Sequence, residues 1–257
     1  MNKLRISLLH VAPVLGNVAH NRRLVESAVR TAAGLGADWA VTPELCIPGY
    51  LFADKIGTDW ILPQPDPWMD EFCRLVGELS ITVFLCHPER DPESGKMFNT
   101  VFVINRHGEI AGHHRKVKTL RGPEAWSSPG ERCDPIECDG IQVGVPVCAD
   151  CYKNDVPQLM KNNGAQILVS PASWGPGGCG PDGEWEQRSE DTGLPVIVCN
   201  RSGIERADLD FREAESVVTQ HGKRLLEATS ATSVVLTFDW DLETMSLASE
   251  DFQRTPL

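Results

Sequence analysis

Three short segments of the sequence each end a strand-like run with a side chain that can take part in acyl transfer. Segments 39–44, 110–116 and 141–148 close on Glu44, Lys116 and Cys148. A carboxylate, an ammonium and a thiol supply a base, a charge that stabilises an oxyanion, and a nucleophile. The carboxyl ends of neighbouring strands in an open α/β protein converge in one crevice. The sequence therefore predicts a cysteine-dependent acyl-transfer site, provided that the three strands are neighbours.

Cys148 follows alternating isoleucine and valine residues from position 141, so we expect it on a sharp turn where a strand ends. An exposed thiol beside a base is drawn toward the thiolate from a free pKa of about 8.5. One alternative is a buried core cysteine. Another is a redox dithiol or zinc site using Cys148 and Cys151, although no second cysteine pair has the usual zinc spacing.

Glu44 and Lys116 each have a functional and a structural interpretation. Glu44 lies in an otherwise apolar segment, where desolvation would raise its pKa toward that of a general base, whereas the alternative is a surface glutamate. Lys116 belongs to a basic cluster in an acidic chain, and such clusters are usually solvated faces. The apolar Val117 and the downstream carboxylate of Glu124 favour a lysine that is paired instead.

Composition limits the class of protein. The 257 residues, 41% apolar and 23% charged, are typical of one globular domain over 1–257. The net charge of −12 argues against nucleic-acid and anionic-membrane partners. No apolar run approaches the roughly 18 residues of a spanning helix, and the N-terminus lacks a signal-peptide pattern. Nine scattered cysteines favour a reducing compartment without a disulfide framework. We therefore expect a soluble, cytoplasmic protein.

Strand and helix patterns alternate along the chain, which predicts a mixed, layered α/β domain that opens with a right-handed β-α-β crossover. An antiparallel hairpin is expected around the turn at 105–108, and a loop rich in proline and glycine over 49–67. The predicted strands are 4–10, 39–42, 81–86, 99–105, 108–114, 141–148, 167–170, 195–199, 215–219 and 233–239, and the predicted helices are 21–35, 68–79, 156–162 and 184–192.

An ordered set of motifs resembles the nitrilase superfamily of carbon-nitrogen hydrolases. The set includes Pro43-Glu44 with Gly49-Tyr50, Arg115-Lys116-Val117, Pro123-Glu124-Ala-Trp126 and Cys148-Ala-Asp150. Each motif is common, but their order and spacing together are specific. The matching segments are 43–50, 98–110, 115–117, 123–130, 143–150, 164–174 and 198–203, with Arg188, and they cover nearly the whole chain.

The resemblance implies a four-layer αββα sandwich of two mixed β-sheets flanked by helices, assembled as a homodimer or higher homo-oligomer. It implies no cofactor and no metal. By the same resemblance Cys148 is the nucleophile, Glu44 the general base, Lys116 the oxyanion-stabilising lysine and Glu124 a second glutamate, while the backbone amide of Ala149 shares the oxyanion. The implied activity is hydrolysis of a small amide or carbamoyl amide through a thioester, with release of ammonia or an amine; a nitrile is less favoured.

Tyr50, Trp126 and Trp174 are the candidate walls of the substrate pocket. An acidic N-carbamoyl substrate would need an arginine, and Arg188 or Arg201 could serve, the alternative for each being a structural role. The motif set has three irregularities. Segment 151–158 lacks the Pro-Glu pair usual after the cysteine. Segment 200–218 is unusually charged, as if to pair subunits or shape the site. Cys179 lies in a glycine-rich stretch that we expect to be a flexible loop.

Two other classes of function are also compatible with the sequence. A catalytically silent binding or scaffold protein could keep the nitrilase fold, although it would have no physical reason to retain a costly cluster of partly buried charges. A thiol redox module could use the pair formed by Cys148 and Cys151.

Overall fold

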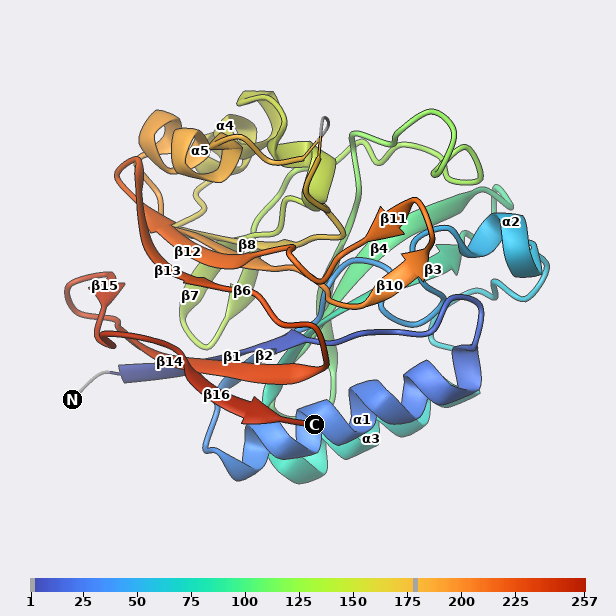
Figure 1. Cartoon of the computed structure of the whole chain (residues 1–257), viewed down its shortest axis with the longest axis horizontal. Coiled ribbons are helices and arrows are strands. Elements are labelled where there is room, and N and C mark those ends of the chain that lie inside the picture. The colour runs from blue at the N-terminus through green and yellow to red at the C-terminus, as the bar shows by residue number, and fades with distance from the viewer. Residues whose placement is uncertain (1–2, 178–179) are drawn as a thin grey trace.

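Two β-sheets face each other, and helices cover their outer faces (Figure 1). The computed structural model describes residues 3–177 and 180–257. Helices α1 and α3 lie side by side on one outer face, and α4 and α5 lie on the other. The predicted αββα sandwich is confirmed.

The first sheet has eight strands in the order β15-β14-β1-β2-β3-β4-β5, with β16 paired to β14. Its strands β1, β2 and β3 run parallel, and β4 and β5 then alternate antiparallel. The elements of this half are β1 (Lys3–His10), α1 (Val18–Gly34), β2 (Trp39–Val41), α2 (Phe52–Ile56), α3 (Pro67–Leu79), β3 (Thr82–Arg90), β4 (Met97–Ile104), β5 (Ile110–Arg115), β14 (Val234–Asp241), β15 (Ser246–Leu247) and β16 (Gln253–Pro256).

The second sheet has six strands in the order β13-β12-β9-β8-β7-β6, and β7, β8 and β9 are parallel. A separate two-stranded hairpin, β10 with β11, follows β9. The elements of this half are β6 (Ile136–Cys138), β7 (Ile141–Gly144), a 3₁₀ helix (Cys148–Cys151), α4 (Asp155–Asn162), β8 (Ile167–Pro171), α5 (Glu184–Thr192), β9 (Val196–Cys199), β10 (Ile204–Arg206), β11 (Leu209–Asp210), β12 (Ser216–Gln220) and β13 (Lys223–Ala228).

Helical periodicity explains how the outer layer packs. In α1 the buried positions recur every three or four residues, which turns one apolar stripe toward the first sheet. Asn17 caps this helix by accepting from the backbone of His20, and Asp66 caps α3 by accepting from Met69 at 2.8 Å. A second apolar cluster fills the space between the two sheets and forms the main core.

This topology brings the predicted reactive residues to one edge of the sandwich. Because β2 and β5 run in the same direction, their carboxyl ends lie at the same edge of the first sheet. The carboxyl ends of the parallel strands β7 and β8 carry the nucleophile turn and segment 172–174 in the second sheet. The catalytic candidates therefore meet between the two sheets.

Three expectations about local structure need correction. The strand predicted over 141–148 ends at Gly144, since Pro146 has no backbone N–H for the ladder and Cys148 begins a 3₁₀ helix. The loop predicted over 49–67 contains the short helix α2. The structure also adds β6, β10, β11, β13, β15 and β16, which the sequence pattern did not reveal.

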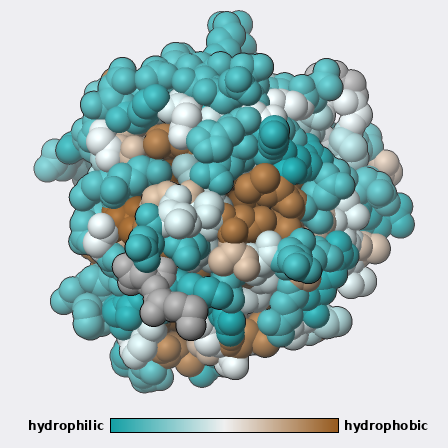
Figure 2. Space-filling model, turned by 90° about the vertical axis from the view of Figure 1, so that its left-hand side faces the viewer, coloured by the Kyte–Doolittle hydropathy of each residue, from teal (hydrophilic) through white to brown (hydrophobic). Residues whose placement is uncertain are grey.

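All cysteines within the described ranges are free, and most are buried. Cys179, expected in a flexible loop, lies outside those ranges. Among the helices described, none combines the length and apolarity needed to cross a bilayer. One face of the molecule, turned toward the viewer in Figure 2, is largely hydrophilic around a hydrophobic region near its centre.

Candidate active site

Glu44, Lys116 and Cys148 come together between the sheets. Lys116 Nζ donates to Glu44 Oε1 at 2.7 Å, and both side chains are fully buried. The Cys148 thiol lies within electrostatic range of both the Glu44 carboxylate and the Lys116 ammonium. Cys148 keeps 4% of its surface exposed, so the site is nearly closed. The structure thus places the three predicted groups in one cluster.

Glu124 and Asn99 complete this cluster. Lys116 Nζ donates to both oxygens of Glu124, at 2.7 and 2.8 Å. The Asn99 amide donates to Glu44 Oε1 and to Glu124 Oε1, each at 2.9 Å, so it bridges the two carboxylates. The Cys86 thiol in turn donates to the Asn99 carbonyl oxygen at 3.3 Å, which orients the amide with its N–H groups toward the carboxylates. The predicted pairing of Glu124 with Lys116 is present.

Cys148 lies at a strained turn. Its φ of +46° is in the left-handed region, which a residue with a Cβ occupies only when its surroundings hold it there. Segment 172–174, after β8, faces this turn. The Ser173 backbone amide donates to Glu44 Oε2 at 3.1 Å. Burial raises the pKa of the Cys148 thiol, and the same amide opposes that rise. One backbone amide therefore acts on both the candidate base and the candidate nucleophile.

Burial and charge set the protonation of the cluster. Burial, followed by the neighbouring Glu44 carboxylate, raises the pKa of the Cys148 thiol well above its ordinary value. Burial also raises the pKa of Glu44, although Lys116 opposes that rise. For Lys116, burial alone would lower the pKa, but Glu44 and Glu124 outweigh it and raise the pKa well above its usual range. The site therefore holds a protonated lysine, a protonated thiol at rest and a carboxylate of raised basicity.

Of the predicted pocket walls, Tyr50 lies within electrostatic range of the cluster, whereas Trp126 contacts the apolar residues around Tyr50. Tyr50 is buried, and its pKa rises because of burial and then of the charges on Glu44 and Glu124. Trp126 packs edge-on against Phe52, with 4.9 Å between ring centroids, in the same apolar cluster as Tyr50. Ala149 is buried in the 3₁₀ helix directly after the nucleophile.

Trp174 is the last residue of segment 172–174 and directly follows Ser173, whose amide binds Glu44. Its ring lies between those of Tyr152 and Trp185, at centroid distances of 4.5 and 5.3 Å. The Asn200 side chain fixes the backbone of Trp174 through two hydrogen bonds, of 3.1 and 2.9 Å. Trp174 is thus placed beside the cluster by its backbone and is braced by aromatic neighbours.

Arg188 and Arg201 have structural partners. Arg188 donates to the carbonyl oxygens of Cys151 and Tyr152, at 3.0 and 3.1 Å, and pairs with Asp191. It therefore holds the end of the 3₁₀ helix that starts at the nucleophile.

Arg201 is fully buried and forms an ion pair with Glu205. Its guanidinium also lies 4.5 Å from the centre of the Phe211 ring and donates to the Pro13 carbonyl at 3.2 Å. Neither arginine reaches the catalytic cluster, so the structure assigns both of them the structural alternative.

Three polar residues in the site have no role that the sequence pattern predicts. Asn99, Ser173 and Asp150 are all buried, and each bonds to Glu44 or to the backbone beside Cys148. A detectable signal existed for Asn99, which is a polar residue on the inward face of an apolar strand. Asp150 and Ser173 gave none, because the contacts that join them to Val117, Lys118 and Glu44 link segments far apart in the sequence.

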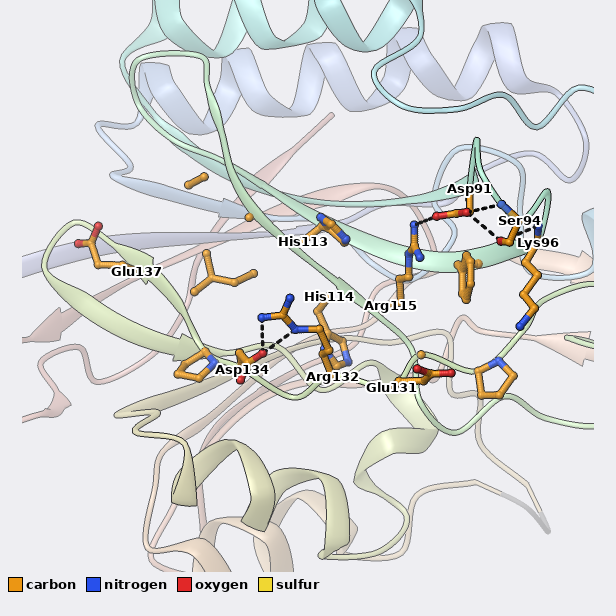
Figure 3. Close-up of a pocket in the computed structure, with 17 residues that line it drawn as sticks. Asp91, Ser94, Lys96, His113, His114, Arg115, Glu131, Arg132, Asp134 and Glu137 are labelled. Carbon is orange, nitrogen blue, oxygen red and sulfur yellow. Dashed lines mark hydrogen bonds and ion pairs between the residues drawn. The ribbon is translucent and has the colours of Figure 1, made fainter.

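A groove of about 770 Å³ runs along β5 and is lined by residues from both faces of that strand, among them His113, His114 and Arg115. Figure 3 shows two ion pairs among its charged side chains. Arg115 reaches Asp91, and Arg132 reaches Asp134. Lys116, next to Arg115 in the chain, does not line this groove. The groove therefore does not contain the cluster itself, although His114, one of its lining residues, lies 3.3 Å from Asp150.

The charged segment 200–218 and Cys151, both unusual in the sequence, make contacts with nearby residues. In the charged segment after β9, Arg206 pairs with Asp208 and Arg212 with Asp210, all on the surface. Burial raises the pKa of Cys151 to about 12, and its sulfur lies 3.7 Å from the Ser170 hydroxyl. Within residues 3–177 and 180–257, no three His, Cys, Asp or Glu side chains are grouped as metal ligands.

Known proteins share sequence similarity with nearly the whole of this chain. A family model described as carbon-nitrogen hydrolase matches residues 5–249. Omega-amidase NIT2 of Danio rerio is 27% identical over 263 residues, covering 95% of this chain and 90% of that protein. A glutamine-dependent NAD(+) synthetase of Thermotoga maritima is 25% identical over 253 residues, covering 95% of this chain. The chain spans only 43% of that synthetase.

Two solved structures share the fold. Nit3 of Saccharomyces cerevisiae, a member of branch 10 of the nitrilase superfamily, has a TM-score of 0.83 at 21% identity, covering 95% of this chain and 92% of that one. A variant amidase from Nesterenkonia sp. AN1, with acrylamide added at its active site cysteine, has a TM-score of 0.76 at 23% identity, covering 91% of this chain and 92% of that one.

Proposed function

The chain belongs to the carbon-nitrogen hydrolase family of the nitrilase superfamily, and we propose that it hydrolyses a small, uncharged amide through a thioester on Cys148. The observation that carries the proposal is the contact of Lys116 with both Glu44 and Glu124 beside the Cys148 thiol. A buried ammonium between two carboxylates is costly to desolvate. Stabilisation of negative charge in a transition state is a function that accounts for its presence.

The first half of the reaction forms the thioester. Glu44 accepts the Cys148 proton as the sulfur attacks the carbonyl carbon of the amide. The carbonyl oxygen becomes an oxyanion, which the Lys116 ammonium and the Ala149 backbone amide stabilise. The intermediate then collapses, the carbon–nitrogen bond breaks, and Glu44 returns its proton to the leaving nitrogen as ammonia departs.

The second half restores the enzyme. Glu44 takes a proton from water as the hydroxide attacks the thioester carbon, and the same two donors stabilise the second oxyanion. The carbon–sulfur bond breaks and Cys148 regains its proton from Glu44. One amide and one water become one carboxylic acid and one ammonia, with no other reactant.

The surroundings of the site favour an uncharged substrate. Of the cations that interact with the catalytic or neighbouring groups in the described ranges, Lys116 is committed to two carboxylates, while Arg188 and Arg201 bind backbone oxygens and carboxylates of their own. The candidate walls Tyr50, Trp126 and Trp174 are aromatic, which suits an aliphatic or aromatic amide better than a dicarboxylate monoamide or an N-carbamoyl acid. The acrylamide adduct of the Nesterenkonia amidase, which involves a small neutral amide, supports this choice.

Ammonia release tests the proposal. We expect turnover of short aliphatic and aromatic amides, with weaker turnover of glutamine, dicarboxylate monoamides, N-carbamoyl amino acids and nitriles. Cys148→Ala should abolish ammonia release while the thermal unfolding midpoint stays close to that of the parent. Full activity in that variant would refute the thioester route, and preference for acidic amides would refute the substrate class. A cytoplasmic location and a homo-oligomeric state stay predictions.

A further inference from the structure

We propose that Asp150 is a positioning residue, which holds the end of the lysine-bearing strand against the nucleophile turn and so sets the separation of Lys116 and Cys148. The inference rests on the proposed function. Asp150 is fully buried, lies two residues after the nucleophile and touches no substrate atom in the proposed reaction. Its carboxylate joins the two sheets at the point where the catalytic groups meet.

One oxygen of Asp150 binds the chain immediately after the lysine. Oδ1 accepts from the backbone amide of Val117 at 3.1 Å and from that of Lys118 at 2.7 Å. Two amides that converge on one ionised oxygen make charge-assisted hydrogen bonds, which are about twice as strong as neutral ones. The backbone that leaves Lys116 therefore has a fixed position relative to Asp150.

The other oxygen of Asp150 binds the chain immediately before the nucleophile. Oδ2 accepts from the Val147 amide at 2.9 Å, and the Asp150 amide donates back to the Val147 carbonyl at 2.9 Å. This reciprocal pair closes the turn in which Cys148 has its φ of +46°. A strained residue of this kind keeps its conformation only where its neighbours are held on both sides.

His114 adds a side-chain contact from β5. Its Nε2 lies 3.3 Å from Asp150 Oδ2, and both side chains are almost fully buried. His114 and Lys116 lie on the same inward face of the chain, two residues apart. Elsewhere around Lys116, its amide donates to the Asn99 carbonyl and its carbonyl accepts from Gly130, each at 2.8 Å. Asp150 joins the backbone around Lys116 to the turn that carries Cys148.

A positioning role and a purely stabilising role predict different measurements. If Asp150 sets the distance from Lys116 to Cys148, its loss weakens the effect of the ammonium on the thiol and on the oxyanion. A displacement of about 1 Å in a catalytic group costs on the order of 100-fold in rate. If Asp150 only stabilises the fold, variants should unfold more easily, but the folded fraction should have unchanged chemistry.

Asp150→Asn is the decisive variant, since it keeps the size of the side chain but replaces one acceptor oxygen with a donor. We expect kcat for a small amide to fall about 100-fold with KM nearly unchanged. We also expect the pH profile of Cys148 alkylation by iodoacetamide to move to higher pH, because the ammonium stabilises the thiolate less. The matched control is Asp155→Asn, which removes an exposed carboxylate paired with the Lys118 side chain and should match the parent in both assays.

A second pair of variants keeps the test valid if Asp150→Asn does not fold. His114→Ala removes one contact to Asp150 and should lower kcat about three- to tenfold at constant KM, and His114→Gln, which can place a donor near Asp150, should restore part of the loss. Parental kcat and an unshifted alkylation profile in the folded Asp150 or His114 variants would overturn the proposal. Alkylation needs no turnover, so an unshifted profile rejects the positioning role even if no amide is hydrolysed, whereas absent turnover with a shifted profile rejects only the proposed function.

Discussion

Lys116 Nζ and Glu44 Oε1 lie 2.7 Å apart, although 72 positions separate the two residues in the chain. Neither side chain has any exposed surface. The contact joins the ends of β2 and β5, which belong to the same sheet but are not adjacent in it. A buried pair of this kind stabilises little compared with apolar packing, whereas the removal of one partner leaves an uncompensated buried charge.

Lys116→Met should therefore damage both stability and activity. Glu44 and Glu124 would face each other without a cation, and the free energy of unfolding should fall by about 3–5 kcal/mol. Amide hydrolysis should drop by a factor on the order of 100 to 1,000, since an oxyanion donor is lost. Urea unfolding and ammonia release measure the two effects. Lys118→Met, which alters a half-exposed ion pair, is the control and should change neither.

Asn99 provides a more selective test of the carboxylate pair. In Asn99→Ala, both glutamates lose a donor and the pKa of Glu44 should rise further, so the rate near neutral pH should fall about tenfold. Asn99→Asp should be worse, because a third carboxylate would face two others. The rates of the parent, Asn99→Ala and Asn99→Asp should therefore decrease in that order. The reverse order for the two variants would show that charge at this position is unimportant, and the exposed Asn162→Ala serves as a control.

The pH dependence of the rate should follow the ionisation of Glu44. Burial raises the pKa of Glu44 above its ordinary value, and the carboxylate must be ionised to accept the thiol proton. The value of kcat/KM should therefore fall as the pH drops through that raised pKa, so the acid limb should lie above the usual glutamate range of about 4.3. Lys116, whose pKa is raised, stays charged across the same range. An acid limb at or below the ordinary glutamate value would contradict this assignment.

The buried pair of Arg201 and Glu205 should behave as a structural unit. Arg201→Met leaves the Glu205 carboxylate buried without its cation, and the free energy of unfolding should fall by about 3–5 kcal/mol. Addition of Glu205→Gln, which keeps an acceptor for the Leu51 amide, should recover at least half of that loss. Additive losses in a double-mutant cycle would argue against coupling. Arg206→Met, at an exposed pair on the same hairpin, should leave the unfolding midpoint unchanged.

His10 should make the fold sensitive to acid. It is fully buried, and burial lowers its pKa to about 4, against about 6.5 in an unfolded chain. Since the folded pKa is the lower one, the neutral histidine contributes full stability above about pH 6.5 and loses it as the pH falls toward about 4. By about pH 5 the loss is roughly 2 kcal/mol. In urea titrations His10→Gln should lose less stability between about pH 7 and pH 5 than the parent, and the exposed His20→Gln should match the parent.

Much of the fold and the centre of the site could be predicted from sequence, because they depend on local patterns. The spacing of apolar residues located α1 and α3, and strand-like runs that end in a reactive residue located Glu44 and Lys116. Contacts between distant segments gave no such signal. The bridging by Asn99 depends on the register of β4 against its neighbours, and the hairpin of β10 and β11 is too charged to be typical of strands.

Arg188 and Arg201 illustrate the same limit of prediction from sequence. A cation near a motif could serve a substrate or the fold, and only the positions of their partners decide between these roles. The backbone oxygens that Arg188 binds lie at the end of the 3₁₀ helix, and the carboxylate that Arg201 binds lies in β10, an element that the sequence pattern did not reveal. The early end of the strand before Cys148 was signalled by Pro146, but its exact position depended on the 3₁₀ helix.

The alternation of side chains along β5 limits how this region can be redesigned. Arg115 faces the groove, whereas the next residue, Lys116, faces the catalytic cluster. Insertion of one residue within β5, before position 115, would shift Arg115 into the place of Lys116, because side chains alternate every residue. The guanidinium would then replace the ammonium between Glu44 and Glu124. New loops grafted onto this hairpin must therefore leave the length of β5 itself unchanged, since a shift of one residue in the strand separates the lysine from its two carboxylates.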